Sequence, residues 1–184
     1  MERHTQRIYD EYLVSASIAG DADSLSRLVI RWQPRLFRHV WRMLGDIDRA
    51  KDVVQDVWME ILCGLPRLDD TAAFPSWAYR IATRRCYREF GRIDRTPSDL
   101  DEDDSLAIPA PVTDSGEFAA EVAEVVAAIA QLPALQRAAS ALFYIDELSV
   151  AEIAIAMDVP PGTVKTRLMH ARRKVRVLLE GESS

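Results

Sequence analysis

The sequence has little of what secreted, membrane-spanning or disulfide-stabilised proteins need. Its 184 residues contain two cysteines, Cys63 and Cys86, which are too few for a disulfide framework and suit a reducing compartment. No apolar run approaches the roughly 20 residues that a membrane span requires. The charged start of the chain, MERHTQRIYDEY, lacks the apolar stretch of a signal peptide. We therefore expect a cytoplasmic protein.

Sequence motifs of enzyme sites are missing as well. The three histidines, His4, His39 and His170, lie far apart, and none is part of an HExxH or CxxC motif. There is no glycine-rich phosphate loop and no GxSxG motif. We expect no catalytic residue, no metal, no cofactor and no enzymatic activity of the chain's own.

The charge of the chain is unevenly distributed. The formal net charge of −6 and the pI of about 5.1 argue, taken alone, against nucleic-acid binding. However, residues 96–126 contain nine acidic residues and no Lys or Arg, whereas residues 1–95 carry a net +2 and residues 127–184 a net +1. The middle of the chain therefore accounts for the whole negative balance.

The acidic middle of the chain also has the composition of a linker. Residues 96–116 contain three prolines, show no sustained apolar period, and include an acid run, Asp99–Asp104, which repels itself and stays solvated. We predict an N-terminal domain at residues 1–95, an acidic flexible linker at 96–116 and a C-terminal domain at 117–184.

Both predicted domains are helical, which makes the expected fold class all-α. Apolar residues at three- and four-residue spacing, from Leu25 to Leu44, predict an amphipathic helix that Pro34 kinks. Ser149 and Glu152 form an S-x-x-E capping box at the start of a short helix. The other expected helices cover about residues 6–19 (more weakly), 48–62, 75–91, 117–132, 133–145 and 163–179.

The short helix that starts after Ser149 and the helix at about 163–179 predict a helix-turn-helix. Ile153, Ala154, Met157, Val159, Val164 and Leu168 supply the apolar contacts between them, and residues 158–162 form the turn. The long helix carries six basic residues and no acid between residues 162 and 179. A helix fits the major groove of DNA, where its basic residues contact phosphates. A solvated basic surface helix is the alternative.

The helix at 75–91 opens a second basic segment. Residues 75–95 contain six arginines against Glu89 and Asp94, and five aromatic residues, Phe74, Trp77, Tyr79, Tyr87 and Phe90, lie among them. A cationic groove with exposed rings holds single-stranded nucleic acid. The same spacing also fits a buried helix face, and composition does not separate the two interpretations.

The helix around residue 55 carries a different kind of surface. Asp52, Gln55, Asp56 and Trp58 are suited to a polar and aromatic patch for a protein partner, in which Trp is often an energetic anchor. An ordinary amphipathic helix explains most of this pattern too.

These segments resemble a known family. Residues 48–58 (DRAKDVVQDVW) and 74–82 (FPSWAYRIA) resemble region 2 of bacterial sigma factors of the sigma-70 family, and residues 132–175 are similar to their region 4. Two such regions joined by a short linker, in fewer than 200 residues, resemble the extracytoplasmic-function (ECF) subgroup.

The resemblance implies a function and a set of binding residues. It implies a sigma factor that binds core RNA polymerase, recognises duplex −35 and melted −10 promoter elements and promotes strand opening, with an anti-sigma factor as a further partner. The implied contacts with core polymerase are Asp52, Val53, Gln55, Asp56 and Trp58. Those with the −10 strand are Asp69, Trp77, Arg80, Arg84, Arg85 and Arg88. Those with the −35 element are Lys165, Thr166, Arg167, Met169, His170, Arg172 and Arg173.

Some residues depart from the family pattern. Arg84 and Arg88 stand where the family usually has Asn and Asp, which implies an atypical −10 preference. His170 takes a place often held by Arg, and Lys51 replaces a Glu. The alternative function is a stand-alone helix-turn-helix regulator with an N-terminal sensing or dimerisation bundle, because response regulators carry a similar C-terminal motif.

Overall fold

The computed structural model describes residues 2–92 and 125–181. The predicted linker and the first part of the helix predicted from Glu117 lie outside the described residues. The described residues form two groups of helices, which we call the N-terminal bundle (residues 2–92) and the C-terminal bundle (residues 125–181). No strand occurs in either range, so the prediction of an all-α fold is confirmed.

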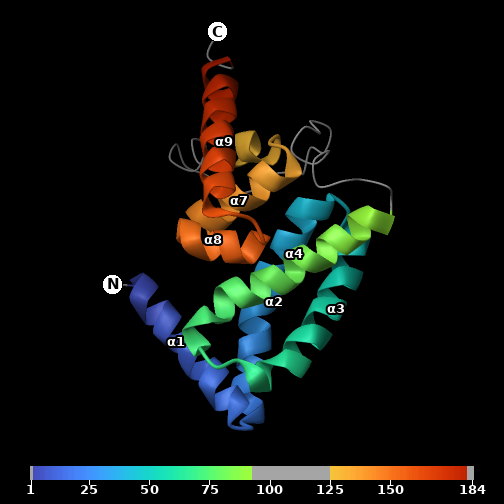
Figure 1. Ribbon diagram of the computed structural model, residues 1–184, viewed down its shortest axis with the longest axis vertical. Coiled ribbons are helices and arrows are strands. Elements are labelled where there is room, and N and C mark those ends of the chain that lie inside the picture. Colours follow the sequence, from blue (N-terminus) through green and yellow to red (C-terminus); the bar gives the residue numbers. More distant parts are fainter. Residues whose placement is uncertain (1, 93–124, 182–184) are drawn as a thin grey trace, which may run out of the picture.

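The N-terminal bundle consists of four helices and two short 3-10 turns (Figure 1). The helices are α1 (Glu2–Ile18), α2 (Ala22–Leu44), α3 (Ile47–Gly64) and α4 (Phe74–Arg92). The 3-10 turns η1 (Leu65–Arg67) and η2 (Thr71–Ala73) connect α3 to α4. The C-terminal bundle contains a helical segment at residues 125–130, α7 (Ala134–Tyr144), α8 (Val150–Met157) and α9 (Pro161–Gly181).

Polar side chains cap the starts of α2, α3, η2 and α8. Asp21 and Asp46 accept backbone N–H groups at the starts of α2 and α3, and Asp70 does the same for η2. Both hydrogen bonds of the predicted capping box form between Ser149 and Glu152. α2 continues through Pro34 as one helix of 23 residues, so the proline does not end it.

The core of the N-terminal bundle is built around Trp32 of α2. The rings of Phe74 and Tyr79 from α4 meet the indole edge-on, with centroids 5.1 and 5.7 Å away. Leu28 and Leu36, which flank Trp32 in the predicted apolar stripe, are fully buried. The stripe therefore forms the inner face of α2, and α4 packs directly against it.

His39 is buried in the same core and faces α4. Its Nε2 lies 2.9 Å from the hydroxyl of Thr83, and its ring contacts that of Tyr79. Burial lowers the pKa of His39 from 6.5 to about 3, and nearby Arg42 lowers it further. The unfolded chain therefore takes up a proton near pH 6.5, whereas the folded protein does so only near pH 3. The contribution of His39 to the free energy of unfolding is therefore fully present above pH 6.5 and decreases as the pH falls towards 3.

We expect this histidine to set the stability of the protein in mildly acidic solution. Between pH 7.5 and 5.5, His39 alone should lower the free energy of unfolding by about 1.4 kcal/mol. His39→Gln cannot titrate, so its unfolding free energy should lose this pH dependence even if the variant is less stable at both pH values. Urea denaturation followed by circular dichroism measures both slopes; equal slopes would show that another group titrates.

The C-terminal bundle contains the predicted helix-turn-helix. Ile153 and Met157 of α8 pack with Val164 and Leu168 of α9, and all four side chains are buried. Asp158 ends α8 in the left-handed conformation, with φ of 55°, which Asp adopts more readily than most residues other than glycine. α7 packs across both helices of the motif and completes the bundle.

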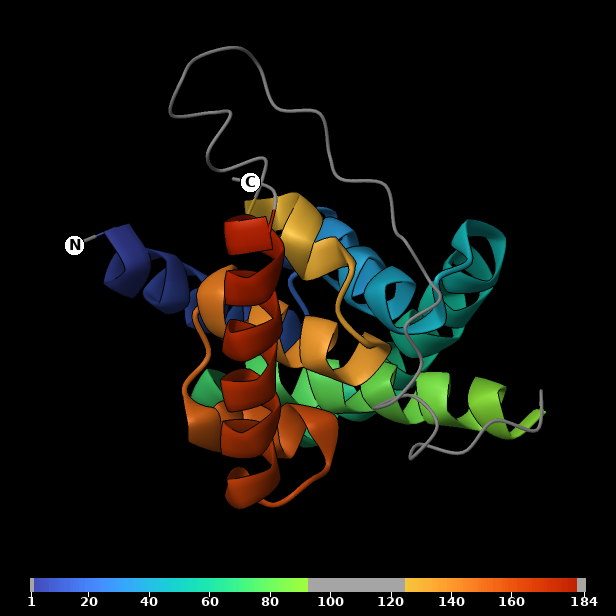
Figure 2. The same ribbon diagram turned by 90° about the horizontal axis from the view of Figure 1, so that it is seen from above.

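The two bundles pack against each other. α8 lies on α4 and α7 lies on α2, and the buried apolar residues form one continuous cluster through both bundles. Figures 1 and 2 show the C-terminal bundle on one side of the N-terminal bundle, with α9 extending away from the contact. The surfaces of α3, α4 and α9 are therefore positioned on one folded body.

Candidate nucleic-acid and protein-binding surfaces

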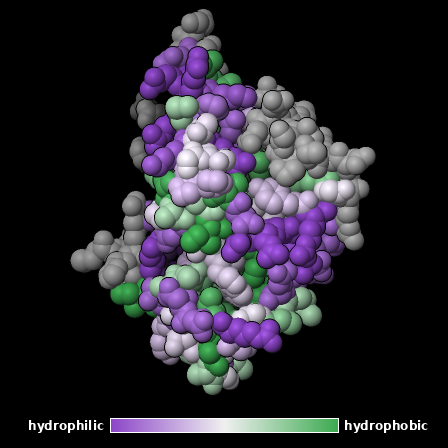
Figure 3. Space-filling model, viewed as in Figure 1, coloured by the Kyte–Doolittle hydropathy of each residue, from purple (hydrophilic) through white to green (hydrophobic). Residues whose placement is uncertain are grey.

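The first half of α9 exposes most of the residues predicted to contact duplex DNA. Val164, Leu168 and Ala171 face the core, which turns the opposite side of the helix to solvent. Hydrophilic side chains cover the projecting part of α9 (Figure 3). The exposed predicted residues are Lys165, Thr166, Met169, His170, Arg172 and Arg173. This surface has the shape and charge that suit a major groove.

Arg167 does not belong to that surface, contrary to the prediction. Its side chain is 8% exposed, so it is not available to a phosphate in this structure. The helical period explains the correction, because residue 167 lies between buried Val164 and Ala171 at three- and four-residue spacing. This spacing was visible in the sequence, but the positive charge suggested the wrong face.

A tyrosine that the sequence analysis did not single out holds one of the exposed cations. Arg172 donates from Nε to the hydroxyl of Tyr144 at 2.6 Å, and its guanidinium lies 5.8 Å from the centre of the tyrosine ring. The contact joins the end of α7 to the exposed side of α9. No motif marks Tyr144 in the sequence, because the two residues are 28 positions apart.

α4 presents a row of arginines on its outer side. Arg80, Arg84 and Arg88 are exposed and recur every four residues, so they lie along one side of the helix. Asp69, in the segment between η1 and η2, is exposed at the start of this helix. The row provides a positively charged track of the kind that follows a nucleic-acid backbone.

The aromatic residues of α4 belong mainly to the core. Phe74, Tyr79 and Phe90 are buried, and Trp77 and Tyr87 are half-buried. Trp77 also packs closely against the end of α3, where a Cβ on Gly64 would lie 2.8 Å from its Cζ2 atom. Most of these rings therefore form a buried helix face and are not exposed in a single-strand groove.

Arg85 points to α3 instead of joining the arginine row. Its guanidinium lies 2.8 Å from the carboxylate of Glu60 and 3.3 Å from that of Asp56. Two residues predicted to contact different partners, Arg85 and Asp56, are thus paired with each other. Sequence spacing did not reveal this, since the pairing depends on how α3 and α4 cross.

The exposed side of α3 is smaller than the sequence analysis predicted. Asp52, Gln55 and Asp56 are exposed, and Met59, which was not predicted, is 64% exposed. Val53 and Trp58 are buried, so the patch lacks its predicted aromatic anchor. Trp58 is only 8% exposed and donates from its indole N–H to the side-chain oxygen of Gln33 on α2.

Replacement of Trp58 should therefore affect stability first. Trp58→Ala leaves a cavity between α2 and α3, and we expect it to lower the free energy of unfolding by about 3 kcal/mol. Met59→Ala, at the exposed neighbouring position, should change it by less than about 0.5 kcal/mol. Urea titration followed by circular dichroism tests both values. A Trp58→Ala protein as stable as the wild type would contradict the burial of the indole.

The described residues include neither a metal-binding group nor a membrane-spanning helix. Within residues 2–92 and 125–181, no group of three or more His, Cys, Asp or Glu side chains is arranged to hold a metal ion. Cys63 is exposed and Cys86 is buried, and burial raises the pKa of the Cys86 thiol. None of the helices in these ranges has the length and apolar character to cross a membrane.

Comparisons with known families and proteins agree with this arrangement. The family model for sigma-70 region 2 matches residues 28–96, and that for sigma-70 region 4 matches residues 123–175. The ECF RNA polymerase sigma-E factor of Escherichia coli K12 is 31% identical over 184 aligned positions, covering 93% of this chain and 94% of that protein. The ECF RNA polymerase sigma factor SigW of Bacillus subtilis is 29% identical, covering 85% and 89%.

Two solved structures share the fold. One is the sigma factor RpoE in complex with the anti-sigma factor NepR from Bartonella quintana, with a TM-score of 0.64, 19% identity and coverage of 86% of this chain and 98% of that one. The other is CnrH in complex with the cytosolic domain of CnrY, with a TM-score of 0.62, 22% identity and coverage of 94% and 98%.

Proposed function

Because this chain belongs to the ECF sigma factors of RNA polymerase, we propose that its exposed helices divide the tasks of promoter recognition among them. The side of α3 with Asp52, Gln55 and Asp56 binds core RNA polymerase. The arginine row of α4 holds the melted −10 strand, and α9 enters the major groove at the −35 element. The chain is a specificity subunit and not an enzyme, and it works in the cytoplasm with core polymerase.

The observation that carries the proposal is the separation of the two basic surfaces. The exposed arginines of α4 and the exposed cations of α9 lie on different bundles, each within the segment that matches the corresponding sigma region. A duplex element and a single-stranded element need different surfaces, one shaped for a groove and one that follows a backbone. The chain offers one of each.

The arginines at 84 and 88 support an atypical −10 preference. Both are exposed in the row on α4, at positions where the family usually has Asn and Asp. An arginine binds phosphate strongly, whereas Asn and Asp make selective hydrogen bonds. We therefore expect this chain to hold the strand more through its backbone and less through base identity than its relatives do.

An anti-sigma factor is part of the proposal. The two solved structures described above are complexes, one with the anti-sigma factor NepR and the other with the cytosolic domain of CnrY. We propose a partner of this kind for the present chain, one that binds it while transcription of its promoters is off.

One experiment distinguishes a sigma factor from the alternative, a stand-alone helix-turn-helix regulator. Purified chain is mixed with core polymerase and passed over a gel-filtration column, and the co-eluting fraction is used for run-off transcription from candidate promoters. We expect co-elution and promoter-dependent transcripts. Tight binding to free DNA without any association with core polymerase would favour the regulator instead.

Neutralising Asp52, an exposed acid of α3, should weaken the association with polymerase. Asp52→Asn keeps the size of the side chain and removes its charge, and we expect about a threefold to fivefold loss of affinity for core polymerase that shrinks at high salt. Asp23, another exposed acid, lies on α2 away from the proposed surface, and Asp23→Asn serves as the control. Titration by fluorescence anisotropy measures both, and equal losses would contradict the assignment of this face.

Lys165 should matter for −35 recognition and not for polymerase binding. We expect Lys165→Ala to lower affinity for a −35 duplex roughly tenfold and to reduce the salt dependence by about one ion. Lys174→Ala is the matched control, because nine residues, or two and a half turns, place it on the opposite side of α9. The duplex is taken from a promoter active in the run-off assay, and equal effects of both variants would refute the assignment.

A further inference from the structure

A tyrosine at the end of α7 is bound to an arginine of α9 at the surface of the C-terminal bundle. Arg172 donates from Nε to the hydroxyl of Tyr144 at 2.6 Å, and its guanidinium lies 5.8 Å from the centre of the tyrosine ring. Arg172 is exposed, and Tyr144 is 49% exposed. Two side chains from different helices thus form one polar group that is open to solvent.

The contact leaves donors of both residues available. A phenolic oxygen that accepts one hydrogen bond still has its own proton to donate. An arginine that donates from Nε still has the N–H groups of both Nη atoms. Arginine and hydroxyl donors of this kind bind the phosphate oxygens of nucleic acids. The pair therefore offers neighbouring donors to a single anion.

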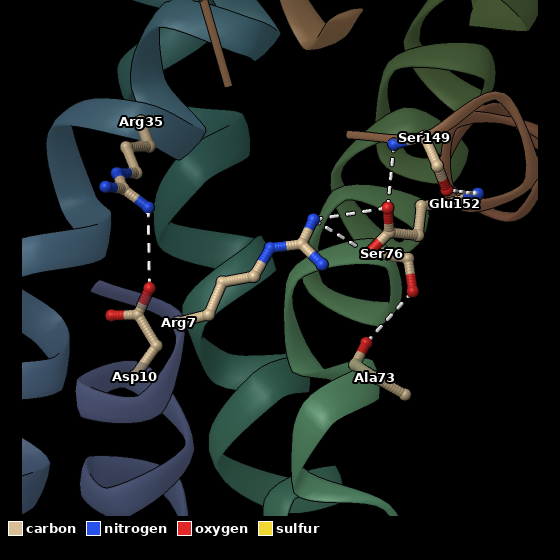
Figure 4. Close-up of polar contacts among 7 residues, drawn as sticks. All are labelled: Arg7, Asp10, Arg35, Ala73, Ser76, Ser149 and Glu152. Atoms are coloured by element: carbon tan, nitrogen blue, oxygen red, sulfur yellow. Dashed lines mark hydrogen bonds and ion pairs between the residues drawn. The ribbon is translucent and has the colours of Figure 1, made fainter. Parts of the chain in front are cut away.

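The position of Tyr144 is set by the turn that follows it. The backbone N–H of Leu148 donates to the carbonyl of Leu142 at 2.9 Å, which closes the turn between α7 and α8. The capping box of Ser149 and Glu152 begins α8 directly after the turn (Figure 4). Tyr144 therefore stands on a hydrogen-bonded backbone, and its hydroxyl can hold the guanidinium in one place.

Arg172 lies at the edge of the exposed side of α9. Leu168, one turn earlier, and Ala171, directly before it, are buried, whereas Lys165 and Met169 are exposed. The major groove is about 12 Å wide and a helix with its side chains is about 10–12 Å across, so the flanks of an inserted helix meet the sugar-phosphate walls. Arg172 is therefore placed for a phosphate and not for a base edge.

The end of α7 and the basic side of α9 form one continuous surface. A cavity of about 420 Å³ is lined by Phe143 and Val150, on either side of the α7–α8 turn, and by Lys165 and Arg172 among the cations of α9. The ring of Phe143 meets that of Tyr144 edge-on, with centroids 4.9 Å apart. A duplex that receives this side of α9 therefore brings its backbone next to the end of α7.

The pair is not needed to join the two helices. α7 and α9 already pack closely, and Leu168 and Ala171 are buried on the inner side of α9. A hydrogen bond between two exposed side chains adds little to stability, because water competes for both partners. The pair is thus better explained by an anion that it binds than by the fold that it joins.

We propose that Tyr144 and Arg172 together hold one phosphate of the duplex backbone beside α9, with Tyr144 as the residue that positions the guanidinium. The inference rests on the assignment of α9 to duplex DNA under the proposed function and deepens it, because it adds a contact from outside α9. Such a contact contributes affinity and fixes the orientation of the helix on the duplex, and it does not read the base sequence.

Tyr144→Phe tests the contact, because it removes the hydroxyl and keeps the ring. We expect it to lower the affinity for a duplex of about 20 base pairs roughly fivefold, both for a promoter sequence active in the run-off assay and for an unrelated sequence. Tyr12→Phe is the matched control, because Tyr12 is an exposed tyrosine on α1 of the N-terminal bundle. Fluorescence anisotropy at one fixed salt concentration measures all of these affinities.

A structural role for the hydroxyl gives a different result. We expect Tyr144→Phe to keep the urea midpoint of the wild type, followed by circular dichroism. A lowered midpoint together with unchanged affinity for both duplexes would show that the hydroxyl serves the fold alone, and would overturn the proposal. Unchanged affinity with an unchanged midpoint would overturn it as well.

A double-mutant cycle shows whether the two residues act as a unit. Arg172→Ala should lower the affinity roughly tenfold and reduce the salt dependence by about one ion. In that background Tyr144→Phe should cost less than about twofold, because the hydroxyl no longer has a guanidinium to position. The same fivefold loss in both backgrounds would contradict the pairing.

Replacement of single phosphates locates the contact on the DNA. Each promoter duplex of the series carries one neutral methylphosphonate in place of one phosphate. We expect a position at which this replacement weakens binding of the wild type and has no effect on Arg172→Ala. Equal effects on the two proteins at every position would refute a phosphate contact by Arg172.

The unrelated duplex separates this inference from the proposed function. A loss caused by Tyr144→Phe on both duplexes, in a chain that shows no preference for the promoter sequence, would refute the proposed function and leave the phosphate contact standing. A preference for the promoter sequence that Tyr144→Phe leaves unchanged in strength and affinity would do the reverse. Failure of the wild-type chain to bind either duplex at low salt would overturn both.

Discussion

The packing of α4 against Trp32 is the constraint on which the rest of the structure depends. Phe74 and Tyr79 are buried against Trp32, and this packing fixes the rotation of α4 about its own axis. Arg80, Arg84 and Arg88 consequently face outward in a row, and Arg85, one position on from Arg84, points to α3. The charge that makes the helix suitable for nucleic acid is thus placed by apolar contacts on its other side.

The buried residues of α9 likewise determine which of its side chains are exposed. Val164, Leu168 and Ala171 fix the inner face, so Lys165 and Met169 are exposed and Arg167 is not. The helix of greatest positive charge, α9, is also the one that extends from the body of the molecule (Figure 1). Tyr144 then orients one of its cations from a neighbouring helix. Recognition surfaces in both bundles are therefore built on rigid cores rather than on loops.

Charge distribution explains how one acidic chain can serve two DNA elements. The net charge of −6 reflects residues 96–126, while both bundles carry exposed basic helices. The acids of the C-terminal bundle are not spread evenly either, because Asp146, Glu152 and Asp158 all face arginines of the N-terminal bundle. Complementary charge at this contact and positive charge at the outer surfaces let the bundles associate without neutralising the exposed basic side of α9.

The sequence by itself determined the helices, the Ser149–Glu152 capping box and the helix-turn-helix, because these follow from local periodicity and from hydrogen bonds between residues a few positions apart. It also located the two segments that match the models of sigma-70 region 2 and region 4. Only the tertiary structure decided which side of a helix is available. Val53, Trp58 and Arg167 are buried, and Arg85 and Asp56 are paired, because of where other helices cross. The hydrogen bonds from Arg137 of α7 to the carbonyl of Arg42 on α2 likewise join residues too distant in sequence for any local pattern to connect.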